Sequence, residues 1–148
     1  MADRQEDPLV SAFFCVKFGD VEGAFRELTG LGSEHEVADY KASGKAGQLV
    51  FQRVPGRMKW NDITLKRGIT SNNKMWDWRD KVTDGGIDNA RVNGSITMHN
   101  QKGKAVARWD FFSAWPSKCN GPTFNASNNE LGVEELVIVH EGYKRVPA

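Results

Sequence analysis

The sequence offers little that would hold a small domain together by covalent or metal cross-links. It contains two cysteines, Cys15 and Cys119, which lie far apart and lack the close spacing of a zinc site. A chain of 148 residues can bury enough surface to fold without such cross-links. We therefore expect two free thiols, no metal and a single domain over residues 1–148.

An excess of charge of one sign is also missing. The 20 Lys and Arg residues are nearly balanced by 19 Asp and Glu residues, whereas nucleic-acid-binding domains usually carry a large basic excess. The longest apolar run, residues 9–16, is much shorter than the roughly 20 residues that cross a bilayer. The charged N-terminus is unlike a signal peptide. We expect a protein made in the cytoplasm, with no membrane span and no specific binding of nucleic acid.

Motifs that carry chemistry are absent as well. The sequence has no nucleophile elbow, dinucleotide-binding glycine loop or phosphate loop. The three histidines fall on three separate predicted strands, without metal-ligand spacing. Cys15 is flanked by Phe14 and Val16, which favours a buried, unreactive thiol. We predict that the protein is not an enzyme and needs no cofactor, and a small hydrolase that uses Cys15 or a carboxylate is the weakest alternative.

Alternation of apolar and polar residues predicts a mainly β fold. Strands are expected over residues 10–18, 24–30, 35–41, 62–68, 91–99, 105–114 and 134–141. One helix is expected over Lys74–Thr83, after possible N-caps at residues 71–73 and before the stop Gly85-Gly86. Regularly spaced strands with turn signals predict an antiparallel β-sandwich or barrel of six to seven strands with one flanking α-helix.

Two breaks in this pattern are predicted from glycine and proline. Residues 42–59 contain Gly44, Gly47, Pro55 and Gly56, which interrupt periodicity, so we expect an extended loop there, with at most a short strand at 48–53. Long loops in compact domains are usually functional or flexible. Pro116 is expected to end the strand that begins at Ala105, because proline cannot donate a ladder hydrogen bond.

The tryptophans suit a core or a subunit interface. Trp76, Trp78, Trp109 and Trp115 lie close to other aromatic residues. Stacking on nucleic acid would also need an excess of basic residues, which is missing. A second function class stays open, a monomeric β-barrel module that binds an apolar ligand among these tryptophans.

Charge is unevenly distributed along the chain. Residues 41–67 hold seven Lys and Arg against Asp62 alone, and residues 130–141 hold four Glu and no Lys or Arg. If these segments lie on opposite surfaces, copies attract head to tail and form rings or filaments; otherwise the first segment is a solvated basic face. The candidate interface residues are Lys41, Lys45, Arg53, Arg57, Lys59, Glu130, Glu134, Glu135 and Glu141.

Several motifs, in their order and spacing, resemble one protein family. They are GAFRELTGL at 23–31, HEVADYK at 35–41, DITLKRG at 62–68, a helix with Trp76 and Trp78, RWDFFSAWP at 108–116 and EELVIVHEG at 134–142. Together they resemble the tail tube proteins of contractile phages and phage tail-like contractile injection systems. The tube protein of type VI secretion is related to this family in fold.

The resemblance implies a hexameric ring whose inward strands form a barrel around a pore. Rings stack into a tube that sheath contraction drives through a target envelope, and the tube conducts cargo. The expected partners are further copies of the chain, a sheath protein, a baseplate hub and lumenal cargo or a length-setting protein. Residues 42–59 correspond in position to a segment that contacts neighbouring subunits. Assembly is expected in the bacterial cytoplasm, before incorporation into a phage tail or injection particle.

A water-filled pore requires strands with one polar face. Two sets of residues meet this requirement, and the alternation leaves open which one faces inward. One set is the polar side of residues 91–99, and the other is Thr64 with Lys66. The first set, our lumen candidates, consists of Arg91, Asn93, Ser95, Thr97 and His99.

Overall fold

The structure, a computed structural model, describes residues 13–69, 71–122 and 132–148, which form ten strands and two helices. The strands are β1 Phe13–Phe18, β2 Val21–Phe25, β3 Glu27–Thr29, β4 Ser33–Ser43, β5 Leu49–Trp60, β6 Ile63–Gly68, β7 Val92–His99, β8 Ala105–Asn120, β9 Val133–Val139 and β10 Gly142–Val146. The helices are α1 Lys74–Thr83 and α2 Ile87–Ala90. The mainly β, antiparallel prediction is confirmed, whereas the predicted numbers of strands and helices are too low.

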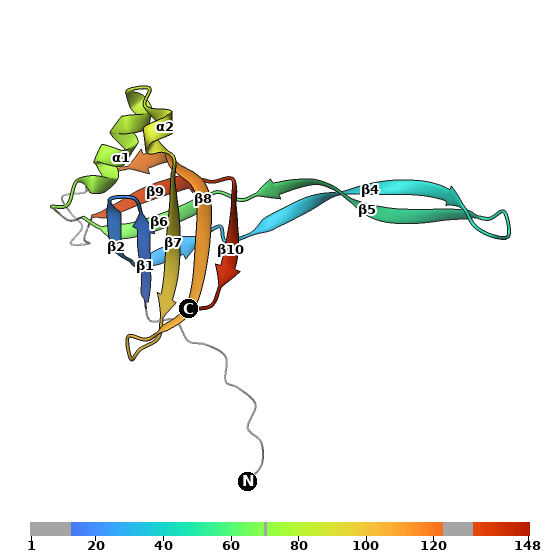
Figure 1. The fold of residues 1–148 in the computed structure, drawn as a ribbon, viewed down its shortest axis with the longest axis horizontal. Coiled ribbons are helices and arrows are strands. Elements are labelled where there is room, and N and C mark those ends of the chain that lie inside the picture. Colours follow the sequence, from blue (N-terminus) through green and yellow to red (C-terminus); the bar gives the residue numbers. More distant parts are fainter. Residues whose placement is uncertain (1–12, 70, 123–131) are drawn as a thin grey trace, which may run out of the picture.

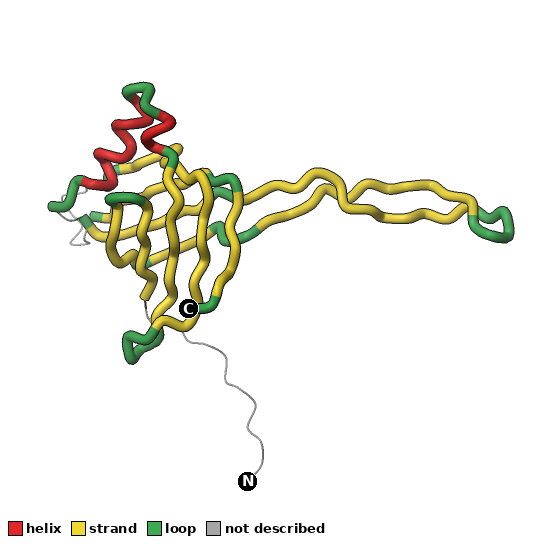
Figure 2. The backbone as a smooth tube through the Cα atoms, in the orientation of Figure 1, coloured by secondary structure: helices red, strands yellow, loops and turns green. Residues whose placement is uncertain are grey.

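The strands form a rounded body and an arm (Figures 1 and 2). The body is one eight-stranded sheet in the order β2-β1-β7-β8-β9-β6-β3, with β10 paired to β8. Its first and last strands, β2 and β3, follow each other in the chain, and Arg26 between them donates its N–H to the Lys66 carbonyl at 2.9 Å. The sheet therefore curls around a core until its two ends nearly meet.

Strand β8 bends from one half of the body to the other. Its first part pairs with β7 and β10, and its last part, from Trp115, pairs with β9. At the bend Ser113 has a φ of 49°, and its N–H donates to Asn93 Oδ1 at 3.1 Å. The prediction that Pro116 ends this strand is wrong. The register is irregular between Pro116 and Lys118, and such irregularities accommodate the missing N–H of proline.

The core lies inside the curled sheet and under α1. Phe18 packs against the rings of Trp78 and Phe111, with centroids 5.7 and 5.8 Å apart. On β1 the buried residues Val16 and Phe18 alternate with exposed Lys17, in agreement with the alternation predicted for residues 10–18. Each such side chain, when fully buried, stabilises the fold by roughly 1.5–3 kcal/mol.

Helix α1 has the predicted bounds, Lys74–Thr83. Its first N–H, from Lys74, donates to Asn72 Oδ1 at 3.0 Å. Beyond its C-terminus Gly85 has a φ of 81°, which glycine adopts at little cost. The indole of Trp78 donates to the Ala90 carbonyl at 2.6 Å, so the core tryptophan also holds α2 in place.

The segment 42–59, predicted to be a loop, is mainly strand. It belongs to a two-stranded antiparallel ribbon in which β4 pairs with β5 from Ser33–Trp60 to Ser43–Leu49. Pro55 and Gly56 lie at an irregularity in this pairing, next to Glu36. A two-stranded ribbon has no covering layer that imposes an apolar–polar alternation, so the sequence pattern of a strand is missing here.

The C-terminal region also differs from the prediction. The predicted strand at residues 134–141 ends at Val139, and a further strand, β10, follows after a turn. On β9 the residues Glu134, Leu136 and Ile138 are buried, whereas their neighbours are half-buried. β9 therefore has one inner face and does not lie between two layers.

Candidate assembly surfaces

The arm formed by β4 and β5 projects from one end of the body, opposite α1 (Figure 1). It carries six of the nine large hydrophobic side chains that are exposed in the described part of the chain: Val37, Tyr40, Leu49, Phe51, Val54 and Met58. Leu49 and Phe51, next to the tip, are 61% and 60% exposed. Exposed apolar groups gathered on one element mark an interaction surface.

The arm also holds all five basic residues of the predicted interface, Lys41, Lys45, Arg53, Arg57 and Lys59. The pairing of β4 with β5 brings three carboxylates, Glu34, Glu36 and Asp39, beside them. Asp39 lies 3.5 Å from Arg53, and the Lys41 ammonium lies 5.7 Å from the centre of the Phe51 ring. The arm is therefore less basic than its sequence alone predicts.

Two of the predicted acidic interface residues lie opposite basic residues of the same subunit. Glu134 is buried, and its carboxylate accepts hydrogen bonds from Arg67 at 3.2 Å and from the Trp76 indole at 3.0 Å. Glu135 lies opposite Lys66 in the β6–β9 register. The prediction that Glu134 faces a neighbouring copy is therefore wrong, because antiparallel pairing of β6 and β9 brings the basic and acidic segments together inside one chain. Glu141 is exposed, and Glu130 lies outside the described residues.

A second surface is the outer face of five neighbouring strands, β2, β1, β7, β8 and β10. Register places Glu22, Lys17, Ser95, Asp110 and Lys144 in one row across these strands. The next row contains Ala24, Cys15, Thr97, Arg108 and Val146. We call this surface the polar face. Its centre is a shallow groove of about 490 Å³ lined in part by Lys17, Ser95, Arg108 and Asp110.

Four of the five lumen candidates belong to this face: Ser95, Thr97 and His99 on β7, and Asn93, which lines the groove. The His99 ring stacks on Phe13 with centroids 4.8 Å apart. Arg91 lies in the turn after α2, before β7 begins, with its guanidinium 3.7 Å from Asp88. The side chain of Asn93 accepts the Ser113 N–H at the bend of β8, which gives it a structural role.

The two cysteines have different surroundings, and neither forms a disulfide. Burial, and then the Glu134 carboxylate, raise the pKa of Cys119 to about 11, so its thiol stays protonated near neutral pH. Cys15 is half-buried on the polar face, opposite Thr97. The prediction that Cys15 is buried was wrong, because on β1 the inward positions are the even-numbered ones.

His140 lies at the root of the arm. Its Nε2–H donates to the Asn61 carbonyl at 3.0 Å, and its Nδ1 accepts the Gly142 N–H at 3.2 Å. The rings of Trp60 and Phe111 lie 5.9 and 5.1 Å away. Burial lowers the pKa of His140, an effect that these two hydrogen bonds and the Asp62 carboxylate oppose. One ring nitrogen donates and the other accepts, which is the pattern of a neutral imidazole.

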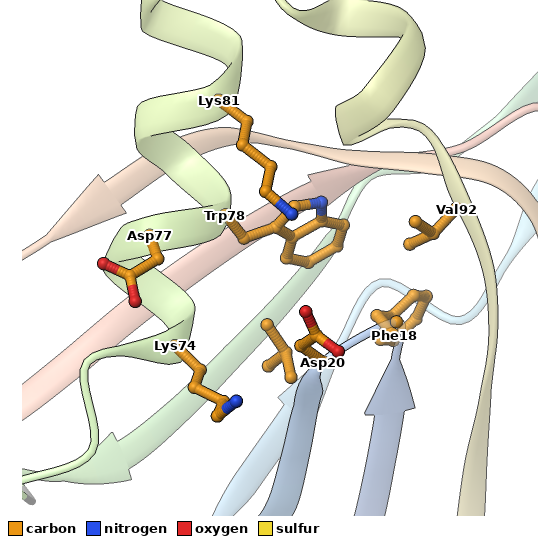
Figure 3. A pocket seen from close by; sticks show the side chains of 9 residues that line it. Phe18, Asp20, Lys74, Asp77, Trp78, Lys81 and Val92 are labelled. Carbon is orange, nitrogen blue, oxygen red and sulfur yellow. The ribbon is translucent and has the colours of Figure 1, made fainter.

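A small cavity lies between α1 and the turn after β1 (Figure 3). Phe18, Trp78 and Val92 give it an apolar floor, and Lys74, Lys81 and Asp20 surround it. Its volume is about 140 Å³. Pockets that hold small organic ligands are commonly about 300–1,000 Å³, so this tryptophan-lined cavity does not favour the ligand-binding alternative.

The described residues contain no cluster of three or more metal-ligating side chains, and none of their helices is long and apolar enough to cross a membrane. The model of the T4-like virus tail tube protein gp19 family matches residues 10–144. The chain belongs to this tail tube family. It is therefore a structural tube subunit, part of a phage tail or of a related injection particle.

Solved structures with the same fold include tube-containing assemblies. A chain of the PVC sheath–tube complex, from an extracellular contractile injection system in its extended state, has a TM-score of 0.82 at 21% identity, over 97% of this chain and 94% of that one. A chain of the anti-feeding prophage cap has a TM-score of 0.78 at 22% identity, over 100% and 97%. Hcp1 from Flavobacterium johnsoniae has a TM-score of 0.59 at 11% identity, over 92% and 96%. None of the curated protein sequences matches this chain.

Proposed function

We propose that the chain forms hexameric rings that stack into the hollow inner tube of a contractile injection system or phage tail, which sheath contraction drives through a target envelope. The observation that carries this proposal is the arm. It extends away from the body and exposes apolar side chains that the subunit does not cover. An exposed ribbon of this kind is suited to burial against another copy.

Each copy uses its arm to bind a neighbouring copy in the ring or in the next ring. The arm and the helix pair lie at opposite ends of the molecule (Figure 1), so the arm reaches a surface that differs from itself. Contacts between unlike surfaces are heterologous and generate rings or open stacks in place of closed dimers. Lys41, Lys45, Arg53, Arg57 and Lys59 contribute charged contacts there, with Glu141 among the acidic candidates.

The polar face lines the bore. A lumen must be wetted, and this face carries hydroxyls and both signs of charge on a regular sheet. Thr64 and Lys66, the alternative set, lie on β6, where Lys66 faces Glu135 within the subunit. Ser95, Thr97 and His99 therefore belong to the lumen surface, together with Lys17, Arg108 and Asp110.

The partners follow from this role. Similarity to chains from a sheath–tube complex and from an anti-feeding prophage baseplate supports contacts with a sheath protein and a baseplate hub. Lumenal cargo or a length-setting protein would occupy the bore. Assembly takes place in the bacterial cytoplasm, before the subunit enters the finished particle.

Electron microscopy of the purified protein tests the proposal. Six-fold rings or hollow rods with a uniform bore are expected at high concentration. A protein that stays monomeric by light scattering at every concentration, including in the presence of its sheath protein, would contradict the proposal and favour a monomeric module.

A further inference from the structure

The two outermost of the five strands that carry the polar face, β2 and β10, have side chains of opposite charge on this face. In the described part of the chain, β2 pairs only with β1 and β10 pairs only with β8, so each leaves one edge without a strand partner. The first edge holds Glu22, with Asp20 just before the strand, and the second edge holds Lys144 on the same face. All three side chains are exposed.

The row between these edges alternates in charge. Glu22 lies opposite Lys17 on β1, and Asp110 lies opposite Lys144 on β10, with Ser95 between the two pairs. Directly opposed charges of unlike sign stabilise a sheet. Glu22 and Lys144 therefore end the row with opposite charges, and neither has a neighbour in the row on its outer side. Asp110 also forms an ion pair with Arg108 on its own strand, at 2.9 Å.

We propose that edge β10 of one copy lies beside edge β2 of the next copy, so that Lys144 faces Glu22 around the ring. This inference rests on the proposed function and specifies which edges meet. It continues the alternation of charge across the subunit boundary and covers two strand edges that would otherwise stay unpaired.

The topology also fixes the direction of this contact. Each pairing from β2 through β1, β7 and β8 to β10 is antiparallel, so β2 and β10 run the same way. Copies related by rotation about the ring axis keep their direction, and the contact is therefore parallel. A register shift of two residues preserves the face, and in one of the two directions it brings Lys144 toward Asp20 in the turn before β2.

Charge reversal tests the contact, with ring formation measured by native mass spectrometry and electron microscopy. Glu22→Lys has two basic edges and Lys144→Glu has two acidic edges, so each variant alone should form about tenfold fewer rings than the wild type, or none. An equimolar mixture should assemble into rings in which the two variants alternate. The double variant, with both charges exchanged, should also assemble.

The control is Lys102→Glu in the turn after β7, which reverses an exposed charge away from both edges. Circular dichroism checks that every variant is folded. Single variants that form rings like the wild type would overturn the edge contact, as would a mixture and a double variant that both stay unassembled. If the wild type forms rings, these results reject only the edge contact and the proposed tube function stands. If the wild type itself forms no rings, the proposed function is contradicted.

Discussion

At the scale of single residues, the buried Arg67–Glu134 ion pair is the most consequential group in the molecule. Glu134 receives hydrogen bonds from a residue of β6 and from Trp76 of α1, so it ties the helix to the sheet. The Arg67 guanidinium also lies 5.5 Å from the centre of the Phe25 ring. Removal of one member leaves a buried charge without its partner, and this is what makes such pairs costly to break.

We predict that Glu134→Ala lowers the free energy of unfolding by about 3–5 kcal/mol, because Arg67 would remain buried without a counter-ion. Urea denaturation of the subunit measures this change. Glu135→Ala is the matched control on the opposite face of β9, and its effect should stay within about 0.5 kcal/mol. Equal effects of the two substitutions would show that Glu134 contributes no more than a surface carboxylate.

His140 gives the subunit a pH dependence. Its pKa is lowered in the fold, mainly by burial, so between the folded pKa and the ordinary value near 6.5 the unfolded chain binds more protons than the folded one. Stability from the neutral ring is thus fully present above about pH 6.5 and is lost as the pH falls toward the folded pKa. Each pKa unit of lowering corresponds to about 1.4 kcal/mol.

We predict that the wild type loses more stability between pH 7.5 and pH 5.5 than His140→Gln does, because glutamine does not titrate. Urea unfolding of both proteins at several pH values gives the two slopes. Parallel slopes would mean that His140 is protonated in the fold without cost.

At the scale of elements, the arm and the body have separate tasks. Leu49 and Phe51 contribute little to the stability of the subunit because they are exposed and lie far from the core. Their burial would come from another copy. Stability and assembly should therefore respond differently to substitutions in the arm.

We predict that the double substitution Leu49→Ser and Phe51→Ser changes the free energy of unfolding by less than about 1 kcal/mol and abolishes rods in electron micrographs. Gln48→Ser, an exposed polar change at the same tip, should leave assembly unaffected. Normal rods from the double variant would exclude the tip of the arm from the contact.

At the scale of the whole molecule, the two cysteines allow the orientation of the subunit in the tube to be measured. Cys119 has a pKa of about 11, so a maleimide at pH 7 should react with Cys15 on the polar face. In a tube with this face inward, a small maleimide should label Cys15. A polyethylene glycol maleimide too large to enter the bore should label monomers and leave tubes nearly unmodified. Fast labelling of intact tubes by the large reagent would place the polar face outside.

The charge distribution shows why linear sequence misjudged part of the assembly surface. The segments 41–67 and 130–141 have opposite charges, and the sequence left open whether they meet between copies or whether the first is a solvated basic face. The register of β6 with β9 instead places Arg67 opposite Glu134 and Lys66 opposite Glu135. Strand pairing joins residues far apart in the chain, so a charge map read along the sequence omits the partner that each residue acquires on folding.

The sequence by itself determined the features that depend on neighbouring residues. The alternation of β1, the bounds of α1 and its glycine stop follow from local periodicity and backbone freedom, and they were predicted correctly. Its order of motifs also determined the family, which the match over residues 10–144 confirms.

Only the tertiary structure decided what depends on pairing across the chain. The ribbon of β4 and β5 has no buried face to impose a pattern, and Pro116 is tolerated at an irregularity in the pairing of β8. In each case the decisive contact is with a strand many residues away. Such contacts leave no periodic signal in the sequence, because long-range pairing and not the local pattern fixes which groups are covered.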